Sequence, residues 1–314
     1  MKRGLETFCL VLGSSAAAAG GAMAQTPDGA GPPTTAMIAV TLGALVAALV
    51  GAVVWDGRRR PSGVKLWAMI VAGAKFLPRH WRRAPGLLVV VVIAYALRFI
   101  FELSDPESAS AIGLGLVAGG LLFLFEASGL RLAFLDRDRG FKLGWLGFSL
   151  GEAEALVYGT RLILLIAYVA AFAVGAGVVA GLYYLLRPLG QESQLMICGA
   201  LAGALFGVLF AMTGRLLLFT PASVAGREVD PVGAWKASHG LAGYGLAAVL
   251  TAYILVFPPV FLGANAVLGP NAPVMPVLYG LLMAASTSFI TGCSSYLVNT
   301  VMPAKPKSDL VFAP

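Results

Sequence analysis

The chain has 314 residues, of which 59% are apolar and only 12% are charged, and its mean hydropathy is +0.86. Soluble domains carry charged side chains at about a quarter of their positions, so this composition excludes a water-soluble globule and indicates a membrane protein. The net charge of +7 does not predict nucleic-acid binding, because the Lys and Arg residues are spread over several short segments beside apolar stretches.

The first 24 residues resemble a secretory leader. Lys2 and Arg3 precede an apolar stretch, and small residues end at Ala22-Met23-Ala24. This pattern predicts a signal peptide over residues 1–24, with an uncleaved first helix as the alternative. Residues 25–35 are rich in Gly and Pro and predict a short periplasmic tail.

Seven apolar segments of membrane-spanning length follow. A hydrocarbon core about 30 Å thick requires about 20 helical residues. We therefore predict an all-α transmembrane domain over residues 36–303, a seven-helix bundle followed by a cytoplasmic tail at 304–314. The predicted spans are 36–55, 85–103, 109–125, 161–186, 195–219, 241–262 and 274–298.

Lys and Arg fall mainly in every second connection between these spans. Such connections stay in the cytoplasm, which predicts a multi-pass protein of the bacterial inner membrane with a periplasmic N-terminus and a cytoplasmic C-terminus. Residues 62–84 mix basic and apolar side chains and predict an amphipathic helix in the headgroup plane. Pro258 and Pro259 predict a kinked or unwound outer end of the sixth span.

The outward-going spans share the pattern Ala-Tyr-x-x-x-Phe. It occurs at Ala94-Tyr95, at Ala167-Tyr168 and at Ala252-Tyr253. A threefold repeat of two-span units would produce it, and so would chance in a chain rich in Ala and Phe. The sequence leaves both explanations open.

Small residues recur at every fourth position in several spans. Such stripes let helices approach closely in lipid, so they predict packing within a compact bundle or a homo-oligomer. The predicted packing positions are Gly115, Gly119, Gly199, Gly203 and Gly207, with similar stripes at Gly43-Ala47-Gly51 and Gly177-Gly181.

Ionisable residues within spans are functional candidates, because burying a charge in lipid is unfavourable. Arg98 and Glu102 stand at i, i+4 spacing and predict a local pair, while Glu126, Arg131 and Arg161 predict anchors at the membrane interface. His80 and His239 are predicted to be surface histidines, and Cys198 and Cys293 have no neighbours at metal-ligand spacing.

Arg215 and the seventh span supply the candidate ligand-binding residues. Arg215 lies in an apolar run, where it either snorkels to the interface or contacts a lipid phosphate or an acidic partner such as Glu152. Four polar residues share one face of the seventh span, and they predict either interhelical hydrogen bonds or the lining of a ligand site. They are Ser288, Thr291, Ser295 and Asn299.

Two segments carry a family resemblance. One segment runs from Gly214 to Gly226 and contains Arg215-Leu216-Leu217-Leu218-Phe219-Thr220-Pro221-Ala222. The other runs from Ala234-Trp235 to Gly240. Both segments resemble bacterial polytopic proteins related to the membrane domain of glycerophosphoryl diester phosphodiesterases. The likeness extends over about residues 65–300, including Phe148 to Glu152 and Tyr296-Leu297. It implies a fold and an envelope location. In that family the hydrolase is a separate soluble domain, so the resemblance does not imply phosphodiesterase activity here, and the leader and first span depart from the family pattern.

No constellation of acid, base, nucleophile or metal ligands specifies a reaction. We therefore expect a non-enzymatic integral membrane protein with no cofactor or metal, acting as a structural, assembly or envelope-organising component. The alternative is a transporter, channel or lipid-handling protein with an anionic-ligand cavity near Arg215. The expected partners are membrane lipids and a second copy or another membrane protein, but no nucleic acid.

Overall fold

The computed structural model describes residues 35–57, 63–104, 108–134, 151–226, 231–269 and 272–302. The predicted signal peptide and the tail at 304–314 lie outside these ranges. Within them every regular element is a helix, as the apolar segments predict. The elements are α2 (Thr35–Gly57), α3 (Leu66–Arg83), α4 (Pro85–Ser104), α5 (Ala109–Phe134), α6 (Glu152–Leu185), η1 (Arg187–Leu189), α7 (Gln191–Leu216), α8 (Phe219–Val224), α9 (Pro231–Ala237), α10 (Ala242–Leu250), η2 (Thr251–Val256), α11 (Phe257–Leu268) and α12 (Val274–Val301).

Seven helical segments in the described ranges are long and apolar enough to cross a membrane. They correspond one to one to the predicted spans, so the predicted all-α fold of seven transmembrane helices is confirmed. The main difference in bounds is at α5, which continues to Phe134 rather than ending near residue 125. Its last turns remain helical because residues 125–132 are buried against neighbouring helices, which stabilises the helix despite two charged side chains.

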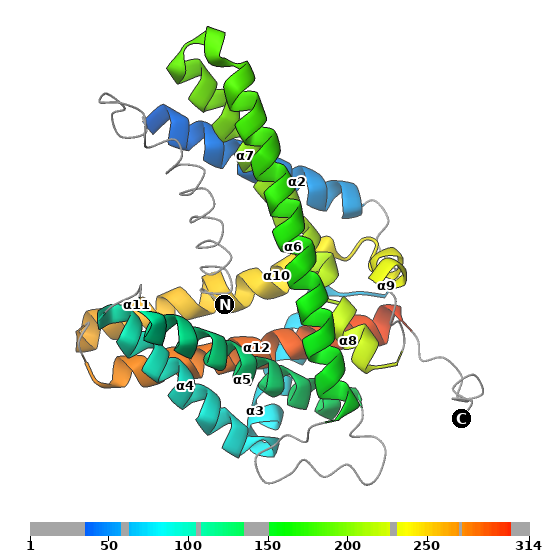
Figure 1. Cartoon of the computed structure of the whole chain (residues 1–314). Coiled ribbons are helices and arrows are strands. Elements are labelled where there is room, and N and C mark those ends of the chain that lie inside the picture. The colour runs from blue at the N-terminus through cyan, green and yellow to red at the C-terminus, as the bar shows by residue number, and fades with distance from the viewer. Residues whose placement is uncertain are drawn as a thin grey trace.

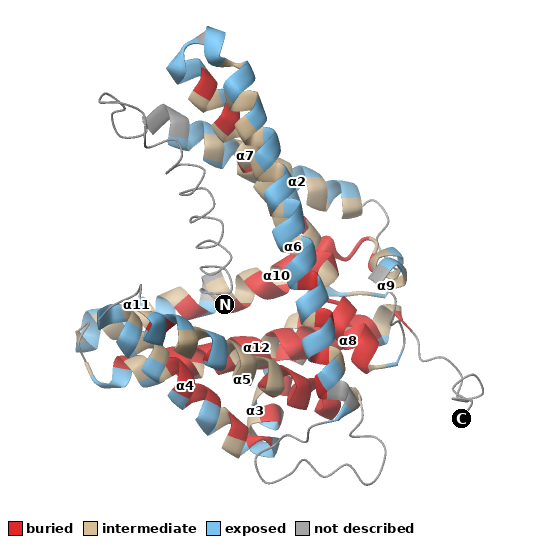
Figure 2. Cartoon of the chain, viewed as in Figure 1, coloured by how far each residue is buried: buried red, intermediate tan, exposed pale blue. Residues whose placement is uncertain are grey.

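Helix α12 forms the centre of the packed part of the molecule (Figure 1). It contacts α3, α4, α5 and α10, and more than half of its most apolar segment is buried. The largest apolar cluster joins α4, α5 and α12 through Leu87, Val91, Phe125, Tyr279 and Met283. Figure 2 shows the buried residues concentrated around α12, α5 and α8. We call α3, α4, α5, α8, α10, η2, α11 and α12 the bundle.

The amphipathic segment forms α3 as predicted, and its apolar face lies on α12. The two helices approach closely at Gly73 of α3 and Gly292 of α12. A Cβ atom on Gly292 would lie 2.6 Å from Cβ of Phe76 and 2.9 Å from Cα of Gly73. Glycine at both positions is therefore what lets these two helices touch, and α3 is a packed component of the bundle.

Helix α2 and the outer halves of α6 and α7 extend beyond the bundle (Figure 1), and we call them the arm. Helix α2 packs along α7, where Gly203 and Gly207 bring the two backbones together: a Cβ on either glycine would clash with the carbonyl oxygens of Thr41 or Leu45. Apart from this contact, the arm exposes most of its side chains (Figure 2). Such apolar exposure is expected where lipid replaces water.

The sixth span stays helical through Pro258 and Pro259, so of the two predicted alternatives the unwound outer end is wrong. A π-helical segment, η2, precedes Pro258 and Pro259, and α11 continues through both prolines. Proline lacks an N–H and so cannot donate the usual helical hydrogen bond. The wider π turn absorbs this defect without ending the helix.

The three Ala-Tyr-x-x-x-Phe segments do not have equivalent surroundings. Phe99 of α4 and Phe257 of α11 both pack against Tyr279 of α12. Phe172 of α6 instead packs against Phe206 of α7, in the arm. Two copies thus share one aromatic cluster and the third lies apart from it.

Candidate functional site

Arg215, the penultimate residue of α7, is almost fully buried, with 6% of its surface exposed. Its guanidinium stacks on the ring of Trp235 at 3.7 Å from the ring centroid and donates to the Trp235 carbonyl oxygen. Its Nε lies 3.4 Å from the hydroxyl of Ser238. Trp235 is presented by the short helix α9, which begins at Pro231 as the sequence predicts. Arg215 is therefore held in one orientation by Trp235 and Ser238.

The acidic partner of Arg215 is Asp56, in the last turn of α2. The closest contact joins Asp56 Oδ1 to Arg215 Nη1 at 3.6 Å. The other carboxylate oxygen accepts a 2.8 Å hydrogen bond from the backbone N–H of Ala242, the first residue of α10. A carboxylate is favourable there, because helix N-termini have unsatisfied N–H groups and a positive dipole end. Asp56 thus joins α2 to both α7 and α10. The side chain of Glu152, the partner suggested by the sequence, lies outside the described ones.

His239 completes the polar group at this end of α7. Its Nδ1 lies 3.8 Å from Asp56 Oδ1, and 43% of its side chain is exposed. One guanidinium, one carboxylate and one imidazole therefore meet within a few ångströms, and together they come from α7, α2 and the segment before α10.

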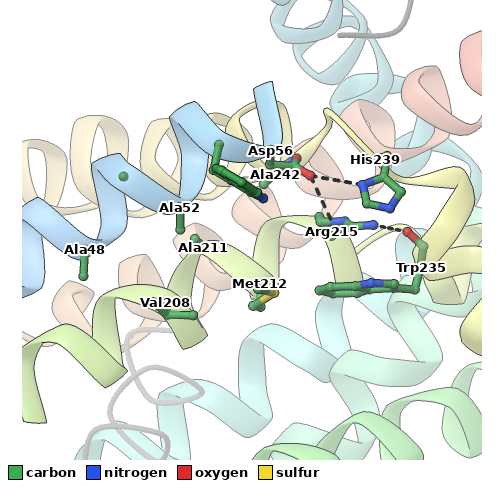
Figure 3. A pocket seen from close by; sticks show the side chains of 12 residues that line it. Ala48, Ala52, Asp56, Val208, Ala211, Met212, Arg215, Trp235, His239 and Ala242 are labelled. Carbon is green, nitrogen blue, oxygen red and sulfur yellow. Dashed lines mark hydrogen bonds and ion pairs between the residues drawn. The ribbon is translucent and has the colours of Figure 1, made fainter. Parts of the chain in front are cut away.

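A cavity of about 740 Å³ extends from this polar group along the interface between α2 and α7 (Figure 3). One end carries the polar side chains Asp56, Arg215 and His239, and the walls are otherwise made by small and apolar residues. These are Ala48, Gly51, Ala52, Trp55, Val208, Ala211, Met212, Trp235 and Ala242. A cavity with apolar walls and charged groups at one end is complementary to an amphiphile.

The packing glycines determine the shape of this interface. Gly199, Gly203 and Gly207 all lie against α2, where an added Cβ would meet Thr41 or Leu45. Gly115 lies beside the Arg98 side chain, and Gly119 has nothing within 4 Å of a built Cβ. The α7 stripe is thus covered by another helix of the same chain, and it holds together the two helices that form the cavity walls.

The four polar candidates on α12 lie away from the cavity lining. Ser288, Thr291 and Ser295 are buried, whereas Asn299 is exposed. Thr291 donates to the carbonyl oxygen of Thr287 and its methyl group lies beside Gly129 of α5. The structure therefore does not bring these residues together with Arg215.

Ser288 belongs to a second polar cluster, centred on His80, and here the sequence prediction is wrong. His80 was expected at the surface, but it is fully buried between α3, α5 and α12. It also stacks on Phe125, with ring centroids 4.2 Å apart. The error arose because basic neighbours suggested an exposed helix, whereas His80 lies on the face of α3 that packs on α12.

The hydrogen bonds around His80 form a continuous chain in which each group donates to the next one. Trp81 donates to Ser288, whose hydroxyl donates to Nδ1 of His80; Nε2 donates to Ser128, which donates to the Phe125 carbonyl. This arrangement uses a neutral imidazole protonated on Nε2. Burial lowers the pKa of His80 to about 3, so the cluster joins three helices without a charge.

Three further ion pairs join charged side chains of the described helices α4, α5 and α6. Arg161 of α6 binds both carboxylate oxygens of Glu126 on α5. The predicted pair of Arg98 with Glu102 is present at 3.3 Å. A third pair joins Arg131 to Glu154 at 3.0 Å, which links the end of α5 to the start of α6. The pairs Arg161–Glu126 and Arg131–Glu154 join two different helices, so spacing along the sequence could not predict them.

Sequence reasoning missed the roles of Asp56, Trp235 and His239. A signal was available for Asp56, since an acidic side chain in the last turn of a helix opposes the helix dipole and so indicates a partner elsewhere. Among the described residues, no group of three or more His, Cys, Asp or Glu side chains is arranged to hold a metal ion.

No protein-family model matches the chain, and no curated protein or solved structure matches it either. The resemblance to the membrane domain of glycerophosphoryl diester phosphodiesterases thus stays a prediction.

Proposed function

We propose that this protein is a lipid-handling membrane protein that binds a membrane amphiphile in the cavity between α2 and α7. The observation that carries the proposal is the combination of apolar walls with Arg215, Asp56 and His239 at one end of the same cavity. A volume of about 740 Å³ falls in the range of about 300–1,000 Å³ that ligand pockets span. An acyl chain would occupy the apolar part, and a phosphate-bearing headgroup would lie near the guanidinium of Arg215.

The chemistry of the site favours binding over a reaction. Arg215 is fixed by Trp235 and Ser238, so it is preorganised as a donor. Asp56 is engaged as the cap of α10, a structural role that holds its carboxylate in place. These side chains can orient a headgroup, and we propose no catalytic role for them.

Filling the cavity tests this function with a matched pair of variants on one helix. Ala52 lines the cavity, whereas Ala47 of the same helix is exposed and does not line it. We expect Ala52→Leu to lose about half or more of the lipid that co-purifies stoichiometrically with the protein, because the added side chain occupies the acyl-chain space. Ala47→Leu should retain it. The measurement is quantitative lipid mass spectrometry of protein extracted in polymer discs.

Equal lipid retention by both variants would contradict the proposal. So would a wild-type protein that retains no lipid.

A structural or assembly role is the second candidate function. Its support is the small-residue stripes of the arm, where Gly43 and Gly51 of α2 and Gly177 and Gly181 of α6 have nothing within 4 Å of a built Cβ. Such stripes would let a helix of a second copy or of another membrane protein pack closely. Loss of assembly in Ala47→Leu, with lipid retention unchanged, would favour this candidate.

We also propose a bacterial inner-membrane location with a cleaved leader, a periplasmic N-terminus and a cytoplasmic C-terminus. Support comes from the exposed basic side chains of α3 and α9, including Arg82, Arg83 and Lys236, because basic connections remain in the cytoplasm. In this orientation the polar end of the cavity faces the cytoplasmic side. Reporter fusions at the C-terminus and N-terminal sequencing of the mature protein test it.

A further inference from the structure

We propose that the headgroup bound at this site is zwitterionic, with a phosphate and a primary ammonium group, so that the ligand is an aminophospholipid such as phosphatidylethanolamine. The inference rests on the proposed amphiphile-binding function and names its ligand class. It replaces the purely anionic ligand suggested by Arg215 alone.

The charge balance of the site is the first argument. Arg215 and Asp56 both line the cavity and are both buried, with 6% and 8% of their side chains exposed. Their charges cancel, and His239 is the third titratable group that faces them. A headgroup with a phosphate alone would satisfy Arg215 but would be repelled by the Asp56 carboxylate. A zwitterion offers an opposite charge to each side chain.

The separation of Arg215 and Asp56 leaves each side chain able to form a further hydrogen bond. Arg215 Nη1 and Asp56 Oδ1 are 3.6 Å apart, which is longer than a normal hydrogen bond of about 2.7–3.2 Å. The Nη1 group can therefore donate a hydrogen bond to a phosphate oxygen, as guanidinium groups do at phosphate sites. Oδ1 can accept from an ammonium group while Oδ2 keeps its bond to Ala242.

A primary ammonium is favoured over a methylated one. A carboxylate oxygen gains a charge-assisted hydrogen bond from an N–H donor, whereas a trimethylammonium group offers only its charge and is bulkier. The half-exposed imidazole of His239, 3.8 Å from Oδ1, provides a further polar group at the headgroup position. The site should therefore distinguish ethanolamine from choline headgroups.

The test is a competition among three lipids with identical acyl chains. The full-length protein is reconstituted in discs that contain equal amounts of phosphatidylethanolamine, phosphatidylcholine and phosphatidylglycerol, and retained lipid is quantified by mass spectrometry. We expect about tenfold enrichment of phosphatidylethanolamine over phosphatidylcholine, the discrimination that one charge-assisted hydrogen bond provides. Phosphatidylglycerol should be depleted relative to phosphatidylethanolamine.

Asp56→Asn tests the role of the carboxylate. The amide oxygen can still accept from Ala242, so the start of α10 remains capped. The ethanolamine-to-choline ratio should fall to about one. Glu102→Gln, which changes a carboxylate paired within α4, should keep the wild-type ratio.

Enrichment of phosphatidylglycerol, or a preference for ethanolamine that survives Asp56→Asn, would overturn the headgroup inference and leave amphiphile binding in place. Retention of none of the three lipids by the wild-type protein would overturn both proposals. The wild-type competition does not depend on the folding of any variant.

Discussion

The bundle and the arm both contain segments apolar enough to span a membrane, yet they use their apolar surfaces differently. More than half of the most apolar segment of α12 is buried within the protein, whereas none of the corresponding segment of α2 is buried (Figure 2). In α12, hydroxyl groups and glycines replace part of the apolar surface, and the buried imidazole of His80 on α3 binds one of these hydroxyl groups. Hydrophobicity thus places both helices in the membrane, while small and polar residues decide which of them packs deeply.

Added side-chain volume should destabilise the bundle strongly and the arm hardly at all. This difference in the free energy of unfolding is the largest effect that we expect. Gly292→Leu should lower the free energy of unfolding by about 3 kcal/mol or more, because the new side chain would collide with Phe76 and Gly73. Gly177→Leu, in the arm, should change it by less than about 0.5 kcal/mol. Unfolding in detergent, followed by circular dichroism, measures both, and similar losses in the two variants would remove the distinction between the regions.

The ion pair between α5 and α6 sets how the arm is joined to the bundle. Glu126→Gln leaves Arg161 without its charged partner, and we expect a loss of about 2–3 kcal/mol. Glu102→Gln breaks a pair within one helix and should cost only about 0.5 kcal/mol. The same unfolding measurement compares them. Equal effects would show that the pair between helices adds nothing beyond a local contact.

Acid should weaken the bundle through His80. The pKa of this imidazole is about 3 in the folded protein and 6.5 ordinarily, so below pH 6.5 the unfolded chain binds a proton that the folded protein excludes. The free energy of unfolding therefore decreases as the pH falls, by about 1.4 kcal/mol per pH unit at most. Between about pH 7.5 and about pH 5 the loss should reach about 2 kcal/mol.

Two histidine variants isolate this effect. His80→Asn should show a smaller decrease in stability on acidification than the wild type, because no imidazole remains to be protonated there. His239→Asn, which changes a half-exposed side chain, should retain the wild-type decrease. If His80→Asn and the wild type lose the same stability on acidification, the neutral buried imidazole is not the source.

The fold was more predictable than the site, for a physical reason. Helix length and hydropathy are properties of contiguous residues, so the seven spans could be located from apolar segments alone. The pairing of Asp56 with Arg215, or of His80 with Ser288, depends on which helices become neighbours. That choice is made by close backbone contacts such as Gly73 with Gly292, which a single sequence does not specify.

Ion pairs within one helix could be predicted from the sequence, whereas pairs between helices could not. Arg98 and Glu102 were predicted correctly because i, i+4 spacing places them together on any helix. Arg161 and Glu126, on different helices, could be predicted only as separate interface residues. Arg215 was identified as unusual, but its spacing from Asp56 in the sequence did not indicate that the two residues would be partners.

The π-helical segment η2 determines which side of α11 faces the bundle. A π turn encloses one more residue than an α turn, so everything after Val256 is rotated by about 100° relative to an uninterrupted α-helix. This rotation brings Phe257 and Phe261 to the aromatic cluster with Phe99 and Tyr279. A sixth span without this π turn would present a different side of α11 to the bundle.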